Sequence, residues 1–142
     1  MKGRLIVIDG LDGAGKQTQA ALLLDRFARA GVPARGISFP DYTHPSSALV
    51  KQYLAGEFGQ ADDVPAYAAS SFYAVDRFAS YVGYWKDDYL AGHTIIADRY
   101  ATSNLIHQMG KLPRGQWDAF IDWSADFEYE KLGLPKPDAV LF

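Results

Sequence analysis

Apolar residues in this chain fall into four short runs, separated by longer segments of helical periodicity. The short runs predict β-strands at 4–9, 34–39, 94–98 and 138–142. The longer segments repeat apolar side chains every three or four positions and predict helices at 14–30, 46–55, 65–90, 101–109 and 117–132. This alternation is typical of an α/β fold, a three-layer sandwich in which helices flank a parallel β-sheet. Ligands of such sheets bind at the carboxyl ends of the strands.

Two of the predicted helices carry more detailed local signals. Helix 46–55 has a serine at its cap and is closed by Gly56. Helix 14–30 should pack one apolar face on the sheet, formed by Ala20, Leu23, Leu24 and Phe27.

The turn between the first strand and the first helix carries the most specific motif. Its glycines at 10, 13 and 15 allow positive φ angles that point several backbone N–H groups inward. Lys16 adds a full positive charge beside the helix N-terminus, as in phosphate-binding loops of the pattern G-x-x-x-x-G-K-[ST]. The alternative is a glycine-rich turn with a merely solvated lysine. We therefore predict binding of a nucleoside triphosphate by residues Gly10, Leu11, Asp12, Gly13, Ala14, Gly15, Lys16, Gln17 and Thr18.

This loop departs from the general pattern at its last position. Gln17 replaces the Ser or Thr whose hydroxyl commonly ligates Mg²⁺. Thr18 lies one residue further on, about 100° round the helix, so it does not simply take over that role.

The strand ends supply further candidates. Asp98 closes the third strand and would point toward the loop phosphates, where it could hold Mg²⁺, and Arg99 offers a planar fork suited to a phosphate. Alternatively, Asp98 caps the next helix with Arg99 as its partner. Tyr73 and Arg77 share a helix face and could stack on and hydrogen-bond a nucleobase, or simply form a surface pair.

Composition limits the partners and the compartment. The 142 residues suit one domain, and a net charge of −3 argues against nucleic acid as the main partner. The chain has no cysteine, and its first apolar run is too short for a signal peptide or a membrane span. We expect a cytoplasmic protein without a membrane partner. The sequence ends on an apolar strand, so we expect residues 1–142 to form a single domain that is incomplete at its C-terminus.

Five motifs in consistent order resemble those of the thymidylate kinases, a family of P-loop nucleoside-monophosphate kinases. They lie at 8–19, 39–40, 73–77, 98–104 and 133–138 and extend over essentially the whole chain. The resemblance implies transfer of the ATP γ-phosphate to thymidine monophosphate (dTMP), giving dTDP, with Mg²⁺ as cofactor.

The resemblance also implies roles for individual residues. Asp12, Lys16 and Arg99 would be catalytic, and Asp12 and Asp98 would position the metal. Phe39 and Tyr73 would enclose the thymine, while Arg77 would donate to one of its carbonyls. The substrate site would comprise Asp12, Phe39, Tyr42, Tyr73, Arg77, Arg99, Asn104 and His107. His107 stands where the family often has an aromatic residue near the sugar.

The expected partners are ATP, dTMP and a second copy of the chain in a homodimer. Two other functions are open. A deoxynucleoside kinase would need a carboxylate at the end of the second strand, where this chain has Ser38 and Phe39 and only the more distant Asp41. A nucleotide-binding module without activity would follow if the arginine-rich lid, expected after residue 142, were absent.

Overall fold

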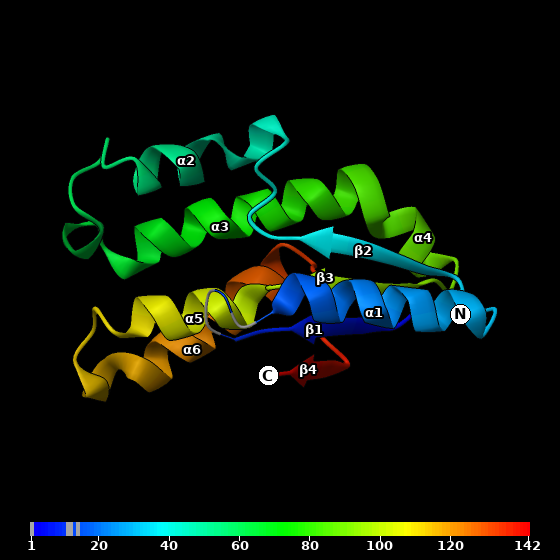
Figure 1. Ribbon diagram of the computed structural model, residues 1–142. Helices are drawn as coiled ribbons and strands as arrows, with labels where there is room; N and C mark the ends of the chain where they lie inside the picture. Colours follow the sequence, from blue (N-terminus) through cyan, green and yellow to red (C-terminus); the bar gives the residue numbers. More distant parts are fainter. Residues whose placement is uncertain (1, 11–12, 14) are drawn as a thin grey trace.

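The computed structural model describes residues 2–10, 13 and 15–142. In this part of the chain four parallel strands form one sheet in the order β2-β3-β1-β4 (Figure 1). They are β1 (Leu5–Ile8), β2 (Ala34–Ser38), β3 (Thr94–Asp98) and β4 (Ala139–Leu141). The parallel sheet flanked by helices confirms the predicted fold class, and each strand lies where the apolar runs placed it.

Helix α1 (Lys16–Arg29) covers one face of the sheet and contacts β1, β2 and β3. Its half-buried apolar side chains are the four that the sequence predicted, namely Ala20, Leu23, Leu24 and Phe27. A Cβ at Gly36 would lie 2.9 Å from Leu24 Cδ1, so the helix packs closely on β2. Predicted residues 15 and 30 only flank the helix.

The opposite face of the sheet packs against the chain that follows α3 (Ala66–Ser80). The continuous helix predicted over 65–90 is wrong in detail, because a π-helical segment (Tyr81–Trp85) separates α3 from α4 (Lys86–Leu90). The wide turn keeps three rings together, with Trp85 4.6 Å from Tyr81 and 5.9 Å from Tyr89 between ring centroids. Trp85 is fully buried, and these rings form the core with strand residues Leu5, Val7, Ile95 and Ala97.

The remaining helices lie toward the carboxyl ends of the strands (Figure 1). They are α2 (Ala48–Leu54), α5 (Ala101–Met109) and α6 (Trp117–Ala125), with 3₁₀ turns at Pro45–Ser47, Ala61–Asp63 and Arg114–Gln116. The helix predicted over 117–132 becomes π-helical at Asp126–Lys131. No described helix is long and apolar enough to span a membrane.

The helix predicted over 46–55 is shorter than expected, although a serine does stand at its cap position as predicted. Ser47 occupies the N-cap position of α2, but among the described residues no side chain caps that helix. The Ser47 hydroxyl donates to the His44 carbonyl oxygen instead, and Ser46 donates to Asp76 of α3 at 2.7 Å. Both serines therefore tie the segment after β2 in place rather than starting a helix.

Candidate functional site

A cavity of about 900 Å³ opens at the carboxyl ends of β1, β2 and β3. Its lining includes thirteen of the predicted site residues: Gly13, Gly15, Lys16, Gln17, Thr18, Phe39, Tyr42, Tyr73, Arg77, Asp98, Arg99, Asn104 and His107. Gly10 lies beside the cavity without lining it, and Leu11, Asp12 and Ala14 lie outside the described residues. Folding thus gathers residues from positions 13 to 107 in one place.

The glycine-rich turn has the backbone geometry that the motif predicted. Gly13 and Gly15 have φ angles of 78° and 85°, a region that residues with a Cβ rarely adopt. Lys16 begins α1 and is only 8% exposed, and its Nζ donates to the Gly10 carbonyl oxygen at 3.3 Å. The alternative of a merely solvated lysine is therefore wrong. Gln17 and Thr18 are exposed at the cavity wall.

Asp9 anchors this turn to α5, which the sequence analysis did not foresee. Its buried carboxylate accepts hydrogen bonds from the Thr102 and Ser103 hydroxyls, both at 3.0 Å, and from the Gly10 N–H at 2.8 Å. A polar residue at a strand end was the signal available, but its two hydroxyl partners lie more than 90 positions away. The start of the glycine-rich turn is therefore fixed to the helix that carries Asn104 and His107.

Asp98 ends β3 with its carboxylate inside the cavity. Its side chain is 8% exposed, and Oδ1 has no hydrogen-bond partner among the described residues. Burial raises the pKa of Asp98, the charge of Lys16 opposes the shift, and the charge of Asp9 adds to it. The helix-cap alternative is wrong, because no described side chain caps α5 at Tyr100.

These properties of Asp98 fit a Mg²⁺ ligand. Mg²⁺ prefers oxygen ligands and keeps several waters, so one or two carboxylates with substrate phosphates are sufficient. The described residues contain no group of three or more His, Cys, Asp or Glu side chains that could hold a metal without such help.

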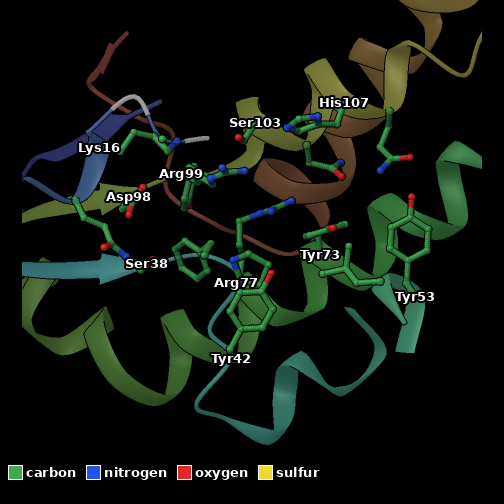
Figure 2. Close-up of a pocket in the computed structure, with 18 of the residues that line it drawn as sticks. Lys16, Ser38, Tyr42, Tyr53, Tyr73, Arg77, Asp98, Arg99, Ser103 and His107 are labelled. Carbon is green, nitrogen blue, oxygen red and sulfur yellow. The ribbon is translucent and has the colours of Figure 1, made fainter. Parts of the chain in front are cut away.

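Arg99 adopts an unusual backbone conformation directly after β3. Its φ angle is 68°, in the left-handed region, which costs a non-glycine residue about 1–3 kcal/mol. The Arg99 N–H donates to the Ile8 carbonyl oxygen at 2.9 Å, so pairing with β1 holds the strained residue. Figure 2 shows the Arg99 side chain near Lys16 and Asp98, at one end of the cavity.

The other part of the cavity has aromatic walls and a buried arginine. Phe39 is buried and lies edge-on to Tyr100 at 5.9 Å, and burial raises the pKa of Tyr73 to about 12. Arg77 is 2% exposed and forms an ion pair with Glu128. The interpretation of Tyr73 and Arg77 as a surface pair is therefore wrong.

Several cavity residues were not predicted from the sequence. Gln108 lies one turn after Asn104 on α5, and both side chains are buried. Asn104 Nδ2 donates to Ser70 Oγ at 2.9 Å, whereas the amide oxygens of Asn104 and Gln108 have no partner among the described residues. The spacing of four within a predicted helix was the signal that could have added Gln108.

The segment after β2 is clamped to α3 by Asp76, which is fully buried. Asp76 accepts from the Asp41 N–H at 2.8 Å as well as from Ser46. Asp41 itself contacts His44 at 2.6 Å and accepts from Thr43. Partial burial raises the pKa of Asp41, but the hydrogen bonds from His44 and Thr43 outweigh it and lower that pKa below 3.8. This clamp holds Tyr42 at the cavity.

The glycine-rich turn, the buried lysine that begins α1 and the parallel sheet together define a P-loop α/β fold. The thymidylate kinase family profile matches residues 8–142. The chain belongs to the thymidylate kinase family.

Individual relatives agree with this assignment. The chain is 33% identical to a thymidylate kinase of Mycobacterium tuberculosis over 135 residues, which covers 94% of this chain and 62% of the relative. It is 31% identical to the human thymidylate kinase, covering 99% of this chain and 60% of that one. A solved thymidylate kinase structure from Candida albicans matches with a TM-score of 0.73 at 29% identity, over 99% of this chain and 62% of that one. The chain thus spans about three-fifths of the length of these relatives.

The raised pKa of Asp98 predicts that its charge costs stability. The folded state binds the Asp98 proton more tightly than the unfolded chain, so stability falls as the pH rises from 3.8 through the raised pKa. Asp98→Asn should therefore stabilise the protein at pH 7, by about 0.5–2 kcal/mol, the scale of a typical stabilising substitution. Urea unfolding at pH 7 and pH 4 measures this.

The gain from Asp98→Asn should shrink at pH 4, where the wild-type carboxyl is more protonated. Asp122→Asn, at an exposed position of α6, is the matched control and should change stability little at either pH. A loss of stability in Asp98→Asn at pH 7 would contradict the interpretation.

Proposed function

We propose that this protein transfers the γ-phosphate of ATP to dTMP, giving ADP and dTDP. The bond between the γ-phosphorus and the β,γ-bridging oxygen breaks, and a phosphate oxygen of dTMP forms the new bond. One observation carries the proposal. A single cavity joins the phosphate-binding turn with Asp98 and Arg99 at one end to the buried Arg77 with aromatic walls further along (Figure 2).

On the donor side, the glycine-rich turn and the N-terminus of α1 would hold the ATP phosphates. Backbone N–H groups and the helix dipole favour an anion there, and Lys16 supplies a full charge against the β- and γ-phosphates. Bound Mg²⁺ would neutralise charge on the transferred phosphate, and Asp98 would hold it directly or through water. Asp12, outside the described residues, is proposed to contact the metal or the acceptor sugar.

On the acceptor side, Arg99 would grip the dTMP phosphate, because its guanidinium can donate two parallel hydrogen bonds to phosphate oxygens. Tyr42 lines the cavity nearby and could reach the same phosphate. Phe39 and Tyr73 would wall the thymine, with Arg77 and Asn104 as its polar contacts and His107 near the sugar. Phosphoryl transfer depends mainly on positioning and charge neutralisation, which this arrangement would provide.

A deoxynucleoside kinase is not favoured. Such an enzyme needs a carboxylate that can take a proton from a sugar hydroxyl. β2 ends at Ser38, and Asp41 does not line the main cavity. The Asp41 carboxylate is in addition engaged by His44 and Thr43.

The proposal extends to partners and compartment. Nucleotides rather than nucleic acid or a membrane are the proposed partners, in keeping with the net charge of −3. The cytoplasm is the proposed compartment, where these nucleotides are dissolved. A homodimer is proposed on the apolar face formed by Val75, Phe78 and Val82, which are 40%, 39% and 51% exposed and lie at helical spacing along α3 and the segment after it.

Nucleotide binding tests the proposed substrate. A ligand that binds only the native state stabilises it by RT ln(1 + [L]/Kd), about 2.7 kcal/mol at a hundredfold excess over Kd. dTMP should raise the melting temperature more than the monophosphates of adenosine, cytidine and uridine at equal concentration. Differential scanning fluorimetry measures the shifts, and equal shifts for all four would exclude a thymine site.

Two arginine variants separate the phosphate from the base. Arg99→Ala should weaken dTMP binding by about 1.5–3 kcal/mol, the scale of a hydrogen bond to a charged group, and should affect thymidine much less. Arg77→Ala should weaken both ligands by similar factors, since both carry the base. Isothermal titration calorimetry gives the four dissociation constants. Equal weakening of thymidine and dTMP by Arg99→Ala would remove Arg99 from the acceptor site.

Charge on the α3 face should break the proposed dimer. Phe78→Glu should convert a dimer to a monomer in sedimentation velocity, because a charge buried at an apolar interface is costly. Leu22→Glu is the matched control, since Leu22 is 54% exposed on α1, away from this face. A wild-type protein that sediments as a monomer would refute the dimer.

A further inference from the structure

Glu128 is a buried carboxylate to which the proposed reaction gives no role. It lies in the π-helical segment Asp126–Lys131, is 2% exposed, and forms an ion pair with Arg77 from α3. The two residues are 51 positions apart in the sequence. One oxygen of Glu128 accepts from the Arg77 guanidinium, and the other has no hydrogen-bond partner among the described residues.

Arg77 belongs to the cavity as well as to this pair. It lines the cavity, and Figure 2 shows it between Lys16 at one end and Tyr53 at the other. Its NH2 group donates to Glu128, while the buried Nε has no partner among the described residues. A buried donor without a partner is unfavourable, so a ligand that supplied an acceptor would be bound in preference to one that did not.

Stability alone does not call for this ion pair. Replacing a buried ion pair by well-packed apolar residues is often neutral or stabilising, because two charges must otherwise lose their water. Removing only one member leaves an uncompensated buried charge. Only Arg77 of this pair lines the cavity, so the pair is more readily explained by what Glu128 does to Arg77 than by stability.

We propose that Glu128 is a positioning residue for base selection, an inference that rests on the proposed function. Its carboxylate holds the guanidinium of Arg77 in one orientation and balances its charge. The remaining N–H donors of Arg77 then face a base carbonyl without competition from a mobile counter-ion. A guanidinium has five donors and no acceptor, so this site accepts a carbonyl oxygen and rejects an amino group at the same place.

Thymine and cytosine differ in this respect. Cytosine carries an amino group where thymine carries a carbonyl, so it would place N–H donors against the donors of Arg77. A site built to hydrogen-bond one substrate group rejects the analogue that lacks it, because the buried polar groups are then left unpaired. The fixed orientation of Arg77 should therefore appear as a preference for dTMP over dCMP.

Glu128→Gln tests the proposal, because glutamine keeps the shape and one acceptor oxygen but removes the charge. Calorimetry on the full chain gives dissociation constants for dTMP, dCMP and ATP. We expect the dissociation constant for dCMP divided by that for dTMP to fall by about tenfold, because about one good hydrogen bond is lost. The dissociation constant for ATP should stay unchanged. Glu130→Gln is the matched control, since Glu130 is exposed on the same segment and should leave the ratio unchanged.

Two further variants keep the test decisive if Glu128→Gln folds poorly. Glu128→Asp retains the charge and should retain most of the preference for dTMP. The double variant Arg77→Met with Glu128→Met replaces the whole pair by apolar residues and should stay folded, yet bind dTMP and dCMP with nearly equal affinity.

The outcomes separate this inference from the function on which it rests. A wild-type protein that binds no dTMP would refute the proposed function, and the role of Glu128 with it. A wild-type protein that prefers dTMP, together with a Glu128→Gln variant that retains that preference, would overturn the role of Glu128 alone. A double variant that retains the preference would overturn the role of Arg77 in base selection and the role of Glu128 with it. Parallel loss of dTMP, dCMP and ATP binding in Glu128→Gln would also overturn it, because Glu128 would then be only structural.

Discussion

The parallel pairing of β3 with both β1 and β2 is the constraint on which the site depends. β3 is buried along its whole length, and its last residue, Asp98, registers with Ile8 on one side and Ser38 on the other. Because parallel strands end at the same edge, the glycine-rich turn, the segment that begins with Phe39, and Arg99 all follow directly from strand ends at one edge of the sheet. A slip of one residue would turn Asp98 away from the cavity, since side chains alternate between the faces of a sheet.

Three residues that line the cavity have features that lower the stability of the folded protein. Arg99 adopts a left-handed φ angle. Asp98 has a buried carboxylate oxygen, and Arg77 a buried Nε–H, that have no hydrogen-bond partner among the described residues. The strained backbone at Arg99 is unfavourable in itself. The unpartnered atoms of Asp98 and Arg77 are also unfavourable, and a ligand that supplied their missing partners would remove that cost. The surrounding contacts that hold them, such as Arg99 N–H to Ile8 and Asp9 to α5, are conventional and well formed.

The two ends of the cavity differ in the charges of the side chains that line them. At the phosphate end, Lys16 and Arg99 lie near Asp98, which suits a polyanion that arrives with a metal ion (Figure 2). Further along, Arg77 is balanced by Glu128 in a setting of aromatic rings, which suits an uncharged base. The two π-helical segments contribute to both the core and this site, since one carries Trp85 and the other carries Glu128.

The sequence by itself determined the positions of the strands, most of the helices and the glycine-rich turn. Periodicity located all four strands, the buried face of α1 and the bounds of α5, and the spacing of glycines and Lys16 identified the turn, because these signals depend on neighbouring residues. The π-helical segments, Asp9 with its hydroxyl partners, the Asp76 clamp and the Arg77–Glu128 pair were decided only by the tertiary structure. Each of these contacts joins residues 30 or more positions apart, or depends on how a helix widens to fit its ring packing. Local pattern carries no information about which distant side chain fills such a position, since that choice is made by packing.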